Sequence, residues 1–122
     1  MTDIERIPGN VPTRHWGSAY KDLVWALGMS DDFSQPFEEQ AKRAFEALDR
    51  GLKSVGSDRT RLLNVQVYLY DIERKRDFDA IWAKWIGDEP AHWPMRSCVQ
   101  VTFAGGNKVE LIAVAARYNP QI

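Results

Sequence analysis

The 122 residues amount to 14.0 kDa, the size of one domain, and we treat residues 1–122 as a single unit. Hydrophobic residues make up 44% of the chain and charged residues 27%, ordinary values that exclude a disordered or fibrous protein. The formal net charge of −1 gives no broad attraction for nucleic acid or for an anionic membrane surface, so we expect neither as a partner.

The first part of the chain predicts short strands and one long helix. Strands are expected over residues 4–7, 14–20 and 23–27, separated by turn signals. Apolar residues recur at three- and four-residue spacing over 37–55, which predicts an amphipathic helix that Gly56 ends. Ser34 or Gln35 is expected to cap this helix, with Pro36 in its first turn.

The second part predicts one strand, one helix and two further strands. Residues 64–70 alternate between aliphatic side chains and polar or aromatic ones, the pattern of a half-buried strand. A second amphipathic helix is expected over 74–86. Strands over 97–103 and 108–118 then follow, joined by a hairpin turn at 104–107.

The predicted order β-β-β-α-β-α-β-β indicates an α+β domain, in which a mixed sheet carries both helices on one face. The last strand is apolar on both of its faces, and Tyr68 and Tyr70 are expected to project away from the helices. A sheet whose second face is also apolar is expected to pack against another subunit.

Cys98 is the one cysteine and cannot form a disulfide within the chain, which predicts a reducing compartment. Without a histidine at a suitable spacing, it fits a small residue packed in a strand better than a nucleophile. The polar residues 1–5 are unlike a secretion signal, and no apolar run has the length of a membrane span. We therefore expect a cytoplasmic protein without membrane contact.

The sequence contains no phosphate loop, no dinucleotide fingerprint and no metal-ligand spacing, so we expect neither a cofactor nor a metal. Trp82 and Trp85 have helix-core spacing and are expected to pack under the sheet. Trp16 and Trp93 lie off that stripe, and each would line either a pocket or a subunit interface.

Arg96 lies just where the predicted strand 97–103 begins, and Glu110 lies inside the predicted strand 108–118. The planar guanidinium of Arg96 suits a carboxylate, whereas Glu110 lies in an apolar run, where a carboxylate must be exposed, paired or functional. Hairpin pairing would place Arg96 near 113–116 and Glu110 near Phe103, so a shared site would need a second subunit. The pattern also fits an arginine at the sheet rim and a solvated strand glutamate.

An ordered set of short motifs runs through the chain. Residues 94–101 (PMRSCVQV) match a P-x-R-S/T-x-V-x-V segment, and residues 108–115 (KVELIAVA) match a V-E-I-x-A-I-A strand. Shorter matches occur at residues 38–41, 55–57 and 67–71. Over residues 14–117 the chain thus resembles the Rid family, also called YjgF/YER057c/UK114. The resemblance implies a chorismate-mutase-like α+β fold and a homotrimer with clefts between its subunits.

The resemblance also implies an activity. Active family members hydrolyse reactive 2-imino acids and enamines to 2-keto acids and ammonia without a cofactor. By position, Arg96 would bind the substrate carboxylate and Glu110 would orient the attacking water, assisted by backbone groups near Cys98. Trp93 would form a wall of the substrate site, and Trp16 lies near the early loop where active members often carry an aromatic residue.

Leu27 departs from the family pattern, because active members often carry a serine or threonine before the glycine that corresponds to Gly28. This difference leaves open a non-catalytic trimer that binds small metabolites. Ribonuclease activity, ascribed to some members, fits the near-neutral charge less well.

Overall fold

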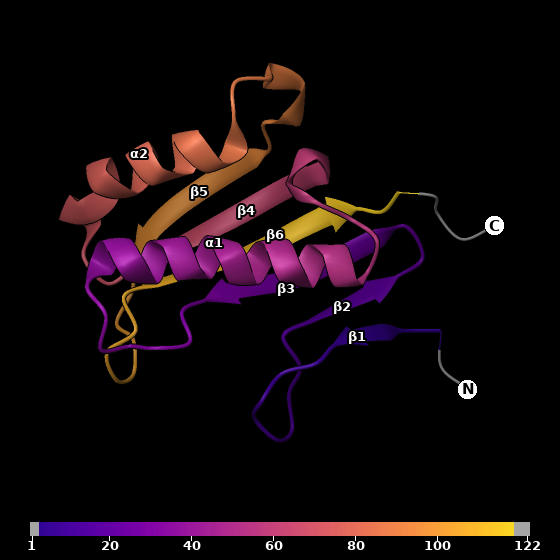
Figure 1. Cartoon of the computed structure of the whole chain (residues 1–122), viewed down its shortest axis with the longest axis horizontal. Coiled ribbons are helices and arrows are strands. Elements are labelled where there is room, and N and C mark those ends of the chain that lie inside the picture. Colours follow the sequence, from indigo (N-terminus) through magenta and orange to yellow (C-terminus); the bar gives the residue numbers. More distant parts are fainter. Residues whose placement is uncertain (1–2, 119–122) are drawn as a thin grey trace.

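The computed structural model describes residues 3–118, in which six strands form one sheet and two helices cover one of its faces (Figure 1). The strand order is β1-β2-β3-β6-β4-β5, and all neighbouring strands are antiparallel except β4 and β5. This arrangement confirms the predicted α+β class. The strands are β1 (Glu5–Ile7), β2 (Gly17–Tyr20), β3 (Leu23–Met29), β4 (Leu62–Leu69), β5 (Met95–Gln100) and β6 (Val109–Ala116).

Helix α1 spans Phe37–Ser54 and helix α2 spans Lys75–Ile86, close to the predicted bounds. Within residues 3–118, neither helix is both long and apolar enough to cross a bilayer. Single 3-10 turns lie at η1 (Arg59–Arg61), η2 (Ile72–Arg74) and η3 (Pro90–His92).

The start of α1 differs from the prediction. Pro36 is the N-cap residue and no side chain caps the helix, so the expected role of Ser34 or Gln35 was wrong. Both side chains instead donate hydrogen bonds to the carboxylate of Asp32, at 2.7 and 3.0 Å, which holds them in the preceding loop. Local turn chemistry therefore takes these two side chains away from the helix end.

The fully buried amide of Gln40 ties the start of α1 to the chain before β6. Its Nε2 donates to the carbonyl oxygens of Phe33, Gln35 and Gly106 at 3.0–3.1 Å, and its Oε1 accepts from the backbone N–H of Lys108 at 3.0 Å. The Gln40 side chain thus supplies hydrogen-bond partners for backbone groups of two loops, and these bonds hold the loops against α1.

The core lies between the helices and the central strands β3, β6 and β4. Alternate residues of β6 are fully buried under the helices, namely Val109, Leu111, Ala113 and Ala115. Helix α1 crosses β3 so closely at Gly28 that a Cβ there would lie 2.5 Å from the carbonyl oxygen of Ala44. A glycine is therefore required at this crossing.

Strands β5 and β6 do not form the predicted hairpin, because β4 lies between them. The segment 101–108 crosses the end of β4 instead, where the N–H of Val101 bonds to the carbonyl of Leu69 and the N–H of Tyr70 to that of Lys108, at 2.9 and 3.0 Å. The turn residues 104–107 lie in this crossover connection.

Large apolar side chains are exposed on the face of the sheet away from the helices, as predicted. Trp25, Met95 and Val99 are 42, 70 and 46% exposed on it. Tyr68 lies there too, but Tyr70 does not. Its ring is 6.1 Å from that of Phe37 at the start of α1, because β4 ends at Leu69 before the chain turns.

Candidate functional site

Arg96 is the second residue of β5 and lies on the side of the sheet that α2 covers. Its Nη2 donates a hydrogen bond to Oδ1 of Asp79 at 2.7 Å. Its guanidinium carbon lies 5.1 Å from the ring centre of Trp82 and 5.6 Å from that of Phe78. Only 18% of the Arg96 side chain is exposed. An ion pair and two aromatic rings thus hold this cation at the outer edge of the sheet.

Asp79 contacts a second cation, Lys75, one helical turn earlier on α2. The Nζ of Lys75 donates to Oδ2 of Asp79 at 2.8 Å, so each carboxylate oxygen has its own positive partner. Burial raises the pKa of Asp79, but hydrogen bonds from Lys75 and Arg96 outweigh burial and bring this pKa below its ordinary value. Asp79 is therefore ionised wherever the protein is folded near neutral pH.

Cys98 lies two residues beyond Arg96 on the same side of β5. Burial raises the pKa of its thiol, and the nearby charges of Arg96 and Lys75 offset only part of that effect. A neutral, partly buried thiol is a poor nucleophile. This geometry agrees with Cys98 as a small residue packed beside the arginine.

Glu110 lies on the opposite face of the sheet. It is the second residue of β6, and its strand neighbours Val109 and Leu111 point under the helices. It pairs with Tyr68 of β4 and Met29 of β3. Burial raises the pKa of the Glu110 carboxyl, and a hydrogen bond from the Asn107 side chain compensates only in part. A carboxylate with a raised pKa is suited to accept a proton from water.

One protomer does not bring Arg96 and Glu110 together. The register places Arg96 beside Val65 and, across β4, level with Ala113, whereas Glu110 lies three residues earlier in β6. The two side chains also lie on different faces of the sheet. The expected direct pairing of their strands was wrong, but the expectation that they do not meet within one chain agrees with the structure.

Trp93 and Trp16 lie at different places. Trp93 is 54% exposed and donates from Nε1 to the carbonyl of Gly87 at 2.9 Å. It lines a cavity of about 250 Å³ together with Trp82, whose ring contacts Arg96. Trp16 directly precedes β2, between β1 and β3, where its backbone N–H donates to the carbonyl of Ile7 and its carbonyl accepts from the N–H of Leu27. Trp93 is therefore close to the arginine site of its own chain, and Trp16 is not.

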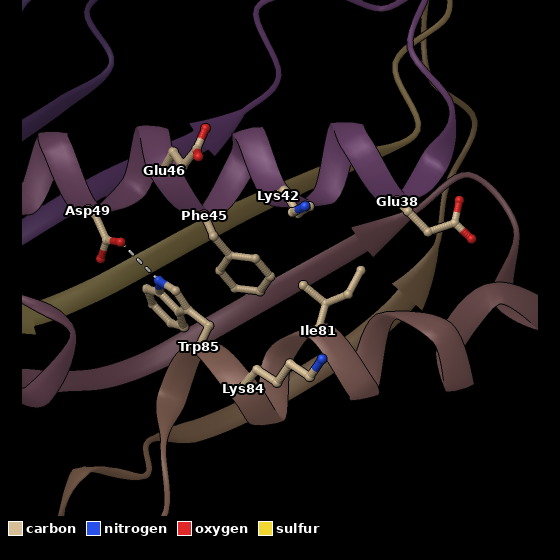
Figure 2. Close-up of a pocket in the computed structure, with 8 residues that line it drawn as sticks. All are labelled: Glu38, Lys42, Phe45, Glu46, Asp49, Ile81, Lys84 and Trp85. Carbon is tan, nitrogen blue, oxygen red and sulfur yellow. Dashed lines mark hydrogen bonds between the residues drawn. The ribbon is translucent and has the colours of Figure 1, made fainter.

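A groove of about 440 Å³ lies between α1 and α2 (Figure 2). Phe45, Ile81 and Trp85 line it, with charged side chains at the rim, and Trp85 donates from Nε1 to Asp49 at 3.0 Å. None of the predicted site residues lines this groove. The ring of Trp85 packs 5.7 Å from that of Trp82, so the groove adjoins the aromatic support of Arg96.

Sequence reasoning missed Asp79 and Lys75. Their spacing of four residues, and the spacing of three between Asp79 and Trp82, place all three side chains along one side of α2. The signal in the sequence that could have pointed to Asp79 is its place beside the aromatic residues of the predicted helix. Within residues 3–118, no group of three histidine, cysteine or carboxylate side chains is arranged to hold a metal ion.

A model of the family described as Endoribonuclease L-PSP matches residues 26–117. The chain belongs to the YjgF/Rid family. Among curated relatives of this YjgF/Rid chain, a RutC family protein of Haemophilus ducreyi is 27% identical over 99 residues, which are 80% of this chain and 83% of the relative.

Solved structures share the YjgF/Rid fold described above. An uncharacterized protein from Pseudomonas aeruginosa is 31% identical with a TM-score of 0.83, and the match covers 94% of this chain and 99% of that one. A member of the YjgF protein family from Neisseria meningitidis is 24% identical with a TM-score of 0.85, over 96% and 97% of the two chains. The similarity therefore extends over nearly the whole domain.

Proposed function

We propose that this YjgF/Rid-family protein hydrolyses reactive 2-imino acids, and the enamines that tautomerise to them, to 2-keto acids and ammonia. The observation that carries the proposal is the pair of groups at positions shared with the family motifs. Arg96 carries a guanidinium that is held by an ion pair and can bind a carboxylate, and Glu110 carries a half-buried carboxyl with a raised pKa. The substrate class is a small imine or enamine that bears a carboxylate.

The proposed reaction needs only binding, water and proton transfer. Arg96 binds the substrate carboxylate through two N–H donors, and Glu110 accepts a proton from water as its oxygen attacks the C=N carbon. Transfer of protons to nitrogen lets the C–N bond break and releases ammonia, while the oxygen becomes the keto group. The reaction is redox-neutral, because the carbon exchanges its bonds to nitrogen for bonds to oxygen without a change of oxidation state.

A homotrimer would supply the second subunit that this site requires. The support is that Arg96 and Glu110 lie on opposite faces of one sheet, while Trp25, Met95 and Val99 expose apolar surface beside Glu110's face. Burial of that surface against a second copy is favourable, and it would bring Glu110 of one subunit toward the β5 edge of its neighbour.

Carboxylate binding without turnover is the second candidate function. Leu27 of β3 favours it, because a leucine cannot supply the hydroxyl that active family members often carry there. A protein of this kind would bind 2-keto or 2-imino acids through Arg96 and act as a sensor or partner.

A keto-acid assay with freshly generated 2-aminoacrylate tests the proposal. Wild type is expected to accelerate pyruvate formation over buffer, and Arg96→Ala to reduce kcat/KM at least about 100-fold, since a charge-assisted bidentate contact is lost. Arg43→Ala is the matched control, because Arg43 is an ion-paired arginine of α1 whose partners are Asp31 and Glu39 and not Asp79. Equal rates for wild type, Arg96→Ala and buffer would contradict the deaminase. Keto-acid binding without acceleration would favour the sensor.

A further inference from the structure

Asp79 is a carboxylate in contact with the arginine that is proposed to bind a carboxylate. We propose that Asp79 is a positioning residue: it fixes the guanidinium of Arg96 against Trp82 and leaves an edge of that guanidinium open for the substrate. This inference rests on the proposed function. The structural basis is the 2.7 Å bond between Arg96 and Asp79 together with the cation–π contact of 5.1 Å between Arg96 and Trp82.

The geometry leaves donors of Arg96 unused. A guanidinium carries five N–H donors in one plane, and a bidentate carboxylate needs two of them. Among residues 3–118, Asp79 is the one hydrogen-bond partner of the Arg96 side chain, and it accepts from Nη2 alone. The rings of Trp82 and Phe78 contact the same guanidinium, which restricts its rotation. Arg96 is therefore held in place while most of its donors remain available.

Lys75 explains why Asp79 does not cancel the charge of Arg96. The second oxygen of Asp79 accepts from Lys75 at 2.8 Å, so the three side chains together carry a formal charge of +1. A substrate carboxylate that approaches this cluster meets a net positive charge. Because Oδ2 of Asp79 is bonded to Lys75, Asp79 makes only one hydrogen bond to Arg96. A carboxylate that bound Arg96 through both oxygens would compete with the substrate, and Asp79 does not bind in this way.

The test compares Asp79→Asn with Asp77→Asn. Asp77 lies on the same helix but pairs with Arg74, so its substitution removes an equal charge without touching Arg96. Binding of 2-oxobutanoate, a stable 2-keto acid, is measured by calorimetry, and KM and kcat with a 2-imino acid substrate. For Asp79→Asn we expect the Kd for 2-oxobutanoate and the KM each to rise about tenfold, with kcat within about twofold of wild type. Asp77→Asn is expected to match wild type in both.

A second measurement follows Arg96 itself. In ¹⁵N-labelled protein, the Nη2–H signal of Arg96, assigned by its loss in Arg96→Lys, is expected to be protected from solvent exchange in wild type and Asp77→Asn, because Nη2 donates to Asp79. In Asp79→Asn it is expected to broaden through faster exchange. Retained protection in Asp79→Asn would overturn the positioning role whatever the kinetics.

The kinetic outcomes separate the two proposals. If wild type binds and turns over substrate, and Asp79→Asn binds 2-oxobutanoate as well or more tightly, Asp79 is a bystander or a competitor and the inference is wrong while the deaminase stands. If wild type neither binds 2-oxobutanoate nor forms keto acid, the proposed function fails, and the inference fails with it.

Discussion

At the scale of the residue, Glu110 combines partial burial with apolar neighbours, and burial raises the pKa of its carboxyl above the ordinary value of 4.5. A raised folded-state pKa means that folding favours the protonated form. The stabilising contribution of Glu110 is thus fully present below its unfolded-state pKa and is lost as pH rises through the folded-state pKa. The residue proposed to activate water therefore works against stability at neutral pH.

Glu110→Gln separates these two effects. Because the amide cannot accept the proton, kcat is expected to fall about 10²- to 10⁴-fold. Because a partly buried charge is removed, the free energy of unfolding at pH 7 is expected to rise, and this gain should vanish at a pH below 4.5, where wild type is protonated as well. Urea unfolding at the two pH values measures it. Glu46→Gln, at an exposed glutamate of α1, is the control, and an equal gain there would contradict the assignment.

Arg96 and Glu110 could be identified from the sequence, because an arginine in a Pro-x-Arg segment and a carboxylate inside an apolar strand are both recognisable without a structure. Asp79 could not, since its role depends on where β5 packs against α2. A carboxylate on the surface of a helix suggests no particular role until the structure shows which cation it contacts.

At the scale of the element, α1 carries a glycine in a position that does not require one. Gly51 is buried within the helix, and a Cβ there would meet only side-chain atoms of Ile7, at 3.6 and 3.8 Å, which are ordinary contact distances. Gly51 therefore has room for a methyl group, whereas at Gly28 the backbone of α1 lies too close for any side chain.

Gly51→Ala is therefore expected to stabilise the protein by about 0.5–1 kcal/mol, because alanine loses less backbone entropy in a helix. Gly28→Ala is the contrasting variant and is expected to destabilise, since its Cβ would lie 2.5 Å from the carbonyl oxygen of Ala44. Denaturant midpoints give both changes. A loss of stability in Gly51→Ala would show that α1 and β1 pack too tightly for one methyl group.

Local patterns predicted the elements better than their pairing. The periodicity from Phe37 onward was sufficient for α1, and alternation was sufficient for β4, because both record which side chains face the core. The pairing of β5 was mispredicted, because Gly105 and Gly106 carry the signature of a hairpin and also serve a crossover. Which strand lies between two others is decided by packing across the sheet.

At the scale of the whole molecule, Arg96 and Glu110 lie on two different faces of the sheet, so the proposed site would be a property of the assembly. The proposed trimer would have a mass three times 14.0 kDa in solution. Light scattering that gives the mass of one chain would contradict a site shared between subunits.

Subunit mixing tests the same division by activity. Arg96→Ala and Glu110→Gln are each expected to be inactive alone. Co-expressed in equal amounts, they would form some interfaces with an intact arginine from one subunit and an intact glutamate from the other, and about a quarter of wild-type activity is expected. Activity as low as that of either variant alone would place both residues in one subunit's site.

The position of β6 also has a consequence for the synthesis of the protein. β6 follows all other strands in sequence, yet it lies in the middle of the sheet and alone joins β3 to β4 (Figure 1). Before it leaves the ribosome, β1–β3 and β4–β5 are separate fragments, each with an unpaired edge. The nascent chain can therefore close its sheet only after residues 109–116 emerge, and until then the edges of β3 and β4 that pair with β6 have no partner strand.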